Sequence, residues 1–140
     1  MNALGKHLLL ELRDCKNDIL NDINAVKSAL VAAATEAGAS IVGVSFHRFN
    51  PHGISGMVII AESHLSVHTW PEYRFAAVDI FTCGDSLKPD QAAAYLIQAF
   101  DSHSPSVMEL KRGLLGAGDG ELPHKVGGDQ GSPQVRCSLS

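Results

Sequence analysis

The hydrophobic residues of this chain fall first into a short continuous run and then into a helical period. The apolar run at residues 7–12 predicts a first strand. Over residues 18–34, apolar side chains recur every three or four positions, which is the spacing of one amphipathic helix. We expect Asn17 or Asp18 to cap that helix at its N-terminus and Gly38 to end it.

Four strand-like stretches follow, with turn signals between them. The first is rich in β-branched and aromatic residues and ends at Asn50-Pro51-His52-Gly53. The predicted ranges of the four strands are 40–49, 54–61, 65–70 and 75–82. Lys88-Pro89-Asp90 then opens a second helix, and residues 107–110 give a last short strand.

The order of these elements, β-α-β-β-β-β-α-β, predicts an α+β fold. We expect a two-layer sandwich in which an antiparallel sheet carries both helices on one face. The predicted domain is residues 1–112. Residues 113–140 are rich in glycine and have little apolar periodicity, so they predict a disordered tail, with Cys137 as an exposed thiol.

Composition and charge exclude several classes of function. A chain of 140 residues suits one domain, and Cys15, Cys83 and Cys137 have no metal-type spacing, so we expect a reduced, cytoplasmic protein. The net charge of −4 has no basic stripe beside it, so nucleic acid is not an expected partner. No apolar run approaches the roughly 20 residues that cross a bilayer, and we expect neither a membrane partner nor export.

Segments 62–72 and 76–84 have the pattern of buried strand but carry reactive and polar side chains. They concentrate hydroxyl, imidazole, carboxylate, indole and thiol groups where a strand would ordinarily place aliphatic residues. Buried polar groups cost free energy unless each has a partner or a function. We therefore take this part of the chain as the candidate active site.

Strand geometry can be applied to these segments directly. A hairpin centred on Tyr73 would set Ser63 opposite Cys83, with about 5 Å between their Cβ atoms. Ser63 and His68 are an odd number of positions apart, so on one flat strand they would face opposite sides. His68 would reach Ser63 only through a bulge, a bend at the bond before Ser63, or another subunit. His64 and His68 would lie about 13 Å apart, too far to share one ion, and we expect no metal site.

Several separated blocks resemble the prokaryotic-type S-adenosylmethionine decarboxylases, small pyruvoyl enzymes of polyamine synthesis. The blocks are Glu62-Ser63-His64, His68-Thr69-Trp70-Pro71-Glu72 and Phe81-Thr82-Cys83-Gly84, supported by Ser45-Phe46-His47 and Gly53-Ile54-Ser55-Gly56. They occur in the family's order, and the resemblance runs from about Gly5 to Gly113. It implies that this chain cleaves itself to make its own cofactor.

The resemblance assigns a role to each reactive residue of the candidate site. In this family the serine matching Ser63 attacks the carbonyl of the preceding residue, here Glu62, and the chain splits between them. The serine remnant becomes a pyruvoyl group, which accepts the electrons released as CO2 leaves the substrate. His68 would transfer protons during processing with the Ser55 hydroxyl in support, and Cys83 would protonate the product carbon. The family also implies a homodimer of cleaved chains, with sites between protomers.

The resemblance makes S-adenosylmethionine the expected small-molecule substrate, decarboxylated to the aminopropyl donor for polyamines. Phe49 and Trp70 become candidate contacts for adenine, and Glu72 for the ribose hydroxyls. Arg74-Phe75 replaces the glycine-aromatic pair usual in the family, so ornithine or arginine is the alternative substrate. Arg74 could point to solvent, bind a substrate carboxylate or pair with Glu72. A rival of another class is a non-enzymatic small-molecule binding module, which would stay uncleaved.

Overall fold

The computed structural model describes residues 3–115 of the chain. Its elements are β1 (Gly5–Arg13), α1 (Asn17–Leu20), α2 (Ile23–Glu36), β2 (Ser40–Arg48), β3 (Ile54–Ala61), β4 (Ser63–Trp70), the 3-10 helix η1 (Pro71–Tyr73), β5 (Phe75–Cys83), α3 (Pro89–Ala99) and β6 (Ser104–Arg112). All of the predicted strands are present, some with different bounds, and helices occupy both of the segments predicted to be helical. The predicted tail beyond residue 115, with Cys137, lies outside the described residues.

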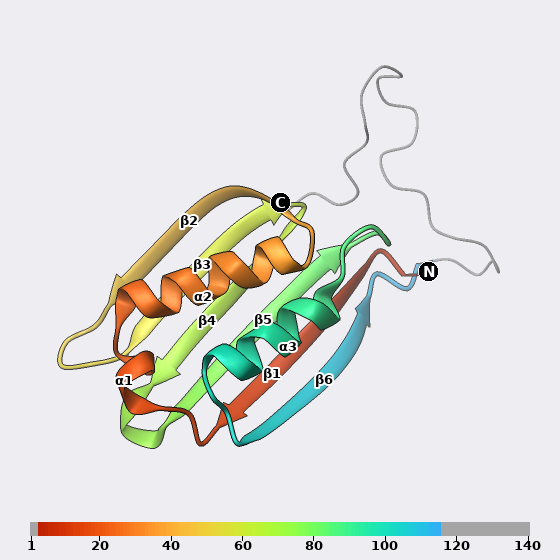
Figure 1. Cartoon of the computed structure of the whole chain (residues 1–140). Helices are drawn as coiled ribbons and strands as arrows, with labels where there is room; N and C mark the ends of the chain where they lie inside the picture. Colours follow the sequence, from red (N-terminus) through yellow and green to blue (C-terminus); the bar gives the residue numbers. More distant parts are fainter. Residues whose placement is uncertain (1–2, 116–140) are drawn as a thin grey trace.

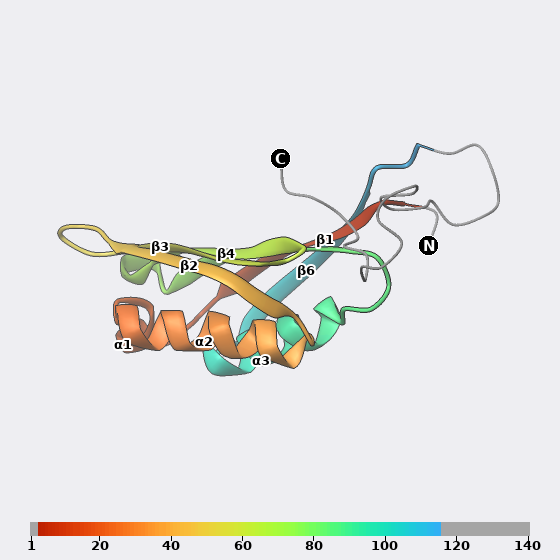
Figure 2. The same cartoon turned by 90° about the horizontal axis from the view of Figure 1, so that it is seen from above.

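The six strands form one antiparallel sheet in the order β2-β3-β4-β5-β1-β6. Helices α2 and α3 pack on the same face of this sheet (Figures 1 and 2). The N-terminal strand β1 lies between β5 and β6, so that Gly5 pairs with both Cys83 and Arg112. This arrangement confirms the predicted α+β two-layer sandwich.

The first predicted helix is divided into two, so the expectation of a single helix over residues 18–34 is wrong. The chain leaves helical geometry at Asn21, and the Asp22 carboxylate then accepts hydrogen bonds from the backbone N–H groups of Asn24 and Ala25. An Asp in this position is an N-cap, which starts a new helix instead of continuing the old one. Gly38, with a φ of +83°, follows the end of α2 as expected. No helix within residues 3–115 is long and apolar enough to span a membrane.

The core lies between the helices and one face of the sheet. Alternate residues of the strands and the apolar stripes of the helices are buried there, among them Leu8, Leu10, Leu12, Val58, Ile60, Leu65, Val67, Val78 and Ile80 from the sheet, and Val26, Leu30, Ala33, Leu96 and Phe100 from α2, α3 and the end of α3. The opposite, helix-free face carries large apolar side chains that stay exposed in one copy of the chain, including Met57, Ile59, Met108 and Leu110.

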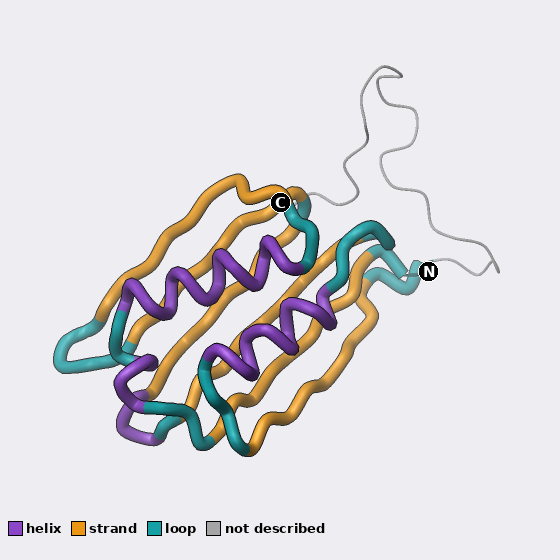
Figure 3. Tube along the Cα trace, viewed as in Figure 1, coloured by secondary structure: helices purple, strands orange, loops and turns teal. Residues whose placement is uncertain are grey.

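The loops place two groups of residues at opposite ends of the sheet. The β3–β4 turn lies at one end, together with the end of β5, because Ile60 pairs with Ser63. The β2–β3 loop and η1 lie at the other end, next to α1 (Figures 1 and 3). Strand β4 runs the whole distance between these two ends.

Candidate active site

Glu62, Ser63 and Cys83, which we call the nucleophile cluster, lie together at the β3–β4 turn. The Oγ of Ser63 lies 3.4 Å from the Sγ of Cys83, and both residues are buried. Ser63 has a φ of +147°, which takes it out of regular strand geometry at the start of β4. The buried side chain of Glu62 and that of Cys83 line a cavity of about 250 Å³ together with residues of the α2–β2 and β5–α3 connections. The chain therefore bends just before Ser63, in a tight turn between β3 and β4.

The predicted hairpin register is wrong by one residue. Ser63 pairs with Thr82 instead of Cys83, because the connection from Trp70 to Phe75 contains four residues, an even number, and so cannot be centred on Tyr73. A one-residue change would ordinarily send the side chain to the other face of the sheet. The unusual φ of Ser63 and the position of Cys83 at the last residue of β5 still bring the two side chains together.

Five other predicted residues gather at the opposite end of the sheet, and we call them the aromatic cluster: Phe49, Ser55, His68, Trp70 and Glu72. All five line one cavity of about 330 Å³. The Oγ of Ser55 lies 2.7 Å from Nδ1 of His68, and the imidazole of His68 lies 6.4 Å from the Trp70 ring, centroid to centroid. The two residues that the family assigns to processing thus share a cavity with the three that it assigns to substrate.

The two clusters are far apart within one chain. The pairing of β4 with β3 and β5 is continuous from Ser63 onward, so no bulge in this strand shortens the distance to His68. Five residues of strand span about 16 Å, and the seven from Ser63 to Trp70 about 23 Å. His68 also points to the helix-free face, while its neighbours Val67 and Thr69 are buried beneath the helices. The expectation that Ser63 and His68 do not meet along one strand agrees with this geometry.

Sequence reasoning missed two residues that build the aromatic cluster. Nε2 of His52 lies 3.0 Å from Oε1 of Glu72. The buried Thr69 hydroxyl donates to the carbonyl of Leu20 at 2.8 Å and accepts from the N–H of Ile54 at 2.9 Å, which ties β3 and β4 to α1. Thr69 could have been identified from the sequence, because the alternation of the strand places this polar residue on the buried face, where its hydroxyl needs partners.

Arg74, the departure from the family pattern, does not pair with Glu72. Its Nη2 lies 3.5 Å from Oδ1 of Asp14, and both side chains are more than half exposed. The backbone of Arg74 has a left-handed φ of +52° at the end of η1, which is a position that favours glycine. Its carbonyl accepts a hydrogen bond from the N–H of Cys15 at 2.9 Å. Of the three possibilities that the sequence left open, a solvent-facing arginine agrees best with these contacts.

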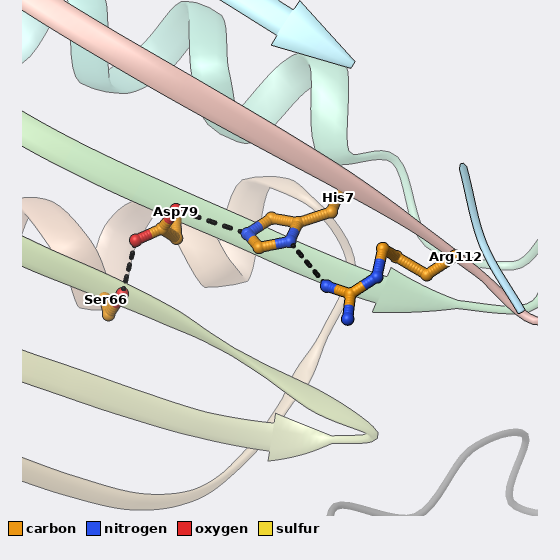
Figure 4. A network of polar contacts seen from close by, with 4 residues as sticks. All are labelled: His7, Ser66, Asp79 and Arg112. Carbon is orange, nitrogen blue, oxygen red and sulfur yellow. Dashed lines mark hydrogen bonds and ion pairs between the residues drawn. The ribbon is translucent and has the colours of Figure 1, made fainter. Parts of the chain in front are cut away.

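A polar network crosses four strands on the helix-free face (Figure 4). Arg112 donates to Nδ1 of His7 at 3.3 Å, Nε2 of His7 contacts Oδ1 of Asp79 at 3.2 Å, and the Ser66 hydroxyl donates to Oδ2 of Asp79 at 3.2 Å. Burial lowers the pKa of the adjacent His64, and His7 lowers it further, while Asp79 acts in the opposite direction. His64 is therefore neutral at neutral pH.

Comparison with known proteins now identifies the family. The model of the family described as S-adenosylmethionine decarboxylase matches residues 6–113. The chain is 58% identical over 126 residues to the S-adenosylmethionine decarboxylase proenzyme of Thermodesulfovibrio yellowstonii, covering 90% of this chain and 93% of the relative. It is 50% identical over 115 residues to the proenzyme of the same name from Carboxydothermus hydrogenoformans, covering 82% and 91%.

A solved structure agrees with these relatives. The crystal structure of the adenosylmethionine decarboxylase from Aquifex aeolicus superimposes with a TM-score of 0.77 at 32% identity, covering 85% of this chain and 98% of that one. The fold and the reactive residues define a small α+β protein with a buried serine and cysteine at a strand turn. The chain belongs to the S-adenosylmethionine decarboxylase family.

Proposed function

We propose that this chain decarboxylates S-adenosylmethionine by means of a pyruvoyl group that it makes from Ser63. The observation that carries the proposal is the nucleophile cluster in a chain of this family, with Oγ of Ser63 3.4 Å from Sγ of Cys83. The relatives are named proenzymes, which agrees with a chain that matures by cleavage. The product is the aminopropyl donor for polyamine synthesis.

Processing is a rearrangement of the peptide bond between Glu62 and Ser63. The Oγ of Ser63 attacks the carbonyl carbon of Glu62 while a base takes the hydroxyl proton, and an ester replaces the peptide bond. Removal of the α-proton of Ser63 then breaks the ester by β-elimination. The leaving group is the main-chain carboxylate of Glu62, which becomes the new C-terminus of fragment 1–62. Water displaces the remaining nitrogen as ammonia, which leaves the pyruvoyl carbonyl at the start of residues 63–140.

The residues around Ser63 serve the decarboxylation that follows. A pyruvoyl group formed at residue 63 would supply a carbonyl that can take the substrate amine and accept the electrons released with CO2. Cys83, in contact with the side chain of Ser63, donates the proton that the product carbon takes up. This role requires Cys83 in its reduced form, whose S–H can give up a proton and take another from solvent.

The aromatic cluster binds the nucleoside part of the substrate. Phe49 and Trp70 offer ring faces, each about half or less exposed, to adenine and to the positive sulfonium. Glu72 supplies a carboxylate beside them, and its contact with His52 keeps it at the wall of the cavity. With Arg74 bound to Asp14, Glu72 remains placed for a ribose, which favours S-adenosylmethionine over ornithine or arginine.

Two copies of the chain are needed to assemble one such site. The roughly 23 Å between the clusters is the length of seven extended residues, more than a nucleoside with an amino-acid tail can span. We therefore assign the aromatic cluster of one copy, including His68 and Ser55, to the Ser63 of a second copy. The exposed apolar side chains of the helix-free face, such as Met57 and Met108, provide the surface on which two such chains can associate.

Chain mass and CO2 release together test this proposal. Purified protein should contain fragments 1–62 and 63–140, the second blocked to N-terminal sequencing, and Ser63→Ala should remain whole and inactive. Carboxyl-labelled S-adenosylmethionine should release CO2, while labelled ornithine and arginine should not. A protein that is active without being cleaved would exclude the pyruvoyl mechanism. A cleaved protein that acts only on ornithine or arginine would assign the substrate to that alternative.

A further inference from the structure

We infer that His52 is a positioning residue for Glu72. It holds the Glu72 carboxylate so that this group can distinguish a ribose from a sugar that lacks the 2′ and 3′ hydroxyls. The inference rests on the proposed function, because it concerns the nucleoside part of that substrate. Neither the family resemblance nor the comparisons give His52 a role, and by sequence it is only one member of a turn.

The contact between His52 and Glu72 is the first part of the argument. Nε2 of His52 lies 3.0 Å from Oε1 of Glu72, within the range of a good hydrogen bond. The side chains are each 39% exposed, so the contact is partly shielded from water. Both residues line the cavity that also contains Phe49 and Trp70. His52 is therefore in the site and contacts the carboxylate there.

The position of His52 is itself fixed by hydrogen bonds on both sides of it. The N–H of Phe49 donates to the carbonyl of Gly53 at 2.8 Å, and the N–H of Gly53 donates to Oδ1 of Asn21 at 3.1 Å. These bonds close the β2–β3 loop and attach it to the segment between α1 and α2. The imidazole is thus presented to η1 by an anchored loop, which is what orienting another side chain requires.

The two oxygens of the Glu72 carboxylate have different partners in this proposal: Oε1 accepts from His52, and Oε2 accepts from the ligand. A carboxylate accepts several hydrogen bonds, so one from Nε2–H of His52 to Oε1 still leaves Oε2 available to accept from the ligand. A glutamate has three rotatable side-chain bonds, and fixing them before the ligand arrives removes part of the entropy cost of binding. Without His52, the Glu72 side chain is no longer held in one rotamer, so its carboxylate is not fixed in the orientation that the ribose needs.

The single tryptophan of the chain makes this inference measurable without turnover. Trp70 is the only tryptophan and lines the cavity, so its fluorescence reports a nucleoside that binds there. Adenosine and 2′,3′-dideoxyadenosine share the base and differ in the ribose hydroxyls. We expect the cleaved wild-type protein to bind adenosine more tightly by about 3- to 10-fold, the range that the net contribution of an ordinary hydrogen bond covers.

Substitution of His52 should remove that preference. In His52→Ala the two nucleosides should bind with nearly equal Kd, while His52→Gln, whose amide can still donate, should retain part of the difference. Combining His52→Ala with Glu72→Ala should weaken adenosine binding no further than Glu72→Ala alone, because His52 acts through Glu72. His103→Ala is the matched control, since His103 contacts Asp101 at 3.3 Å on the exposed surface, and it should behave as wild type.

Some results would overturn the inference while leaving the proposed function intact. These are a wild-type protein that does not distinguish the two nucleosides, or a His52→Ala protein that keeps the full preference or weakens both nucleosides equally. CO2 release from S-adenosylmethionine by the same wild-type sample reports on the proposed function separately. Fragment masses and thermal unfolding of each variant show whether it has folded and been processed.

Discussion

Ser63 and Cys83 touch in this structure, yet the proposed mechanism uses them at different stages. In that mechanism Ser63 would be consumed in making the cofactor, whereas Cys83 would supply a proton in every turnover. In Cys83→Ala we expect cleavage at Ser63 to persist at an equal or lower rate, while decarboxylation falls by about 100-fold or more, which is the usual contribution of a general acid. The mass of fragment 63–140 should also increase during turnover as misplaced protonation converts the pyruvoyl end into alanine.

Cys15→Ala is the matched control for that experiment, because Cys15 is a buried cysteine outside both clusters. It should be cleaved and should turn over as the wild-type protein does. Normal turnover in Cys83→Ala would remove this thiol from the mechanism. Loss of cleavage in Cys83→Ala would instead assign Cys83 to processing.

Cys15 also gives a prediction about pH. Burial raises the pKa of its thiol to about 11, with smaller contributions in the same direction from Asp14 and Asp101. The thiol is therefore protonated at pH 8, and iodoacetamide should label Cys15 in urea but not in the folded protein. Peptide mass mapping after labelling distinguishes Cys15 from the other cysteines.

The sign of the effect on stability follows from the same shift. In the unfolded chain the thiol ionises near 9.0, so between about pH 9 and 11 the folded state holds more protons than the unfolded state. The free energy of unfolding should then fall as the pH rises through this window. The fall should be smaller in Cys15→Ala, and urea unfolding of both proteins at pH 8 and pH 10.5 measures the difference. Equal falls in the two proteins would contradict the assignment to Cys15.

At the scale of elements, the sequence predicted strands best where both a buried face and clear turns were present. The bounds of β3 match the predicted strand at residues 54–61. The apolar run there lies between the turn at residues 50–53, which contains a proline and a glycine, and a polar segment. The last strand was predicted only over residues 107–110, whereas β6 runs from Ser104 to Arg112. This strand lies at the edge of the sheet and is exposed along its whole length, so it lacks the alternation that marks a half-buried strand.

Connections between elements were predicted less well, because they depend on local hydrogen bonds. The Asp22 cap divided one predicted helix, and the 3-10 turn at Pro71–Tyr73 moved the hairpin register by one residue. The division of the site into two clusters could not be found from motif order alone. It required the register of β4 and the side of the sheet on which each loop lies, and only the odd spacing of Ser63 and His68 hinted at it.

At the scale of the whole molecule, a site shared between two copies would account for an uncovered sheet face. The helix-free face combines apolar side chains such as Ile59 and Leu110 with the network of His7 and Asp79. Association through this face would bury the apolar groups and leave the polar ones paired with one another. The network would then favour one orientation of the two sheets, as buried polar groups do in some other assemblies.

Mixing two inactive proteins tests the shared site. Ser63→Ala lacks the source of the pyruvoyl group but retains an intact aromatic cluster, whereas Trp70→Ala retains Ser63 and lacks the indole. If each site uses Ser63 of one copy and Trp70 of the other, a mixed dimer contains one complete site. Co-expression of the two variants should therefore restore up to about a quarter of the wild-type activity, since about half of randomly formed dimers are mixed.

The matched control places both substitutions in one chain. A Ser63→Ala, Trp70→Ala double variant co-expressed with wild-type protein forms mixed dimers in which neither site is complete, so the activity per wild-type chain should fall below that of wild-type protein expressed alone. Sites contained within single chains predict the reverse pattern, because the two single variants would stay inactive together and the wild-type chain of each mixed dimer would keep its own site. Different affinity tags on the two chains allow the mixed dimer to be isolated, and CO2 release per dimer then decides between the two arrangements.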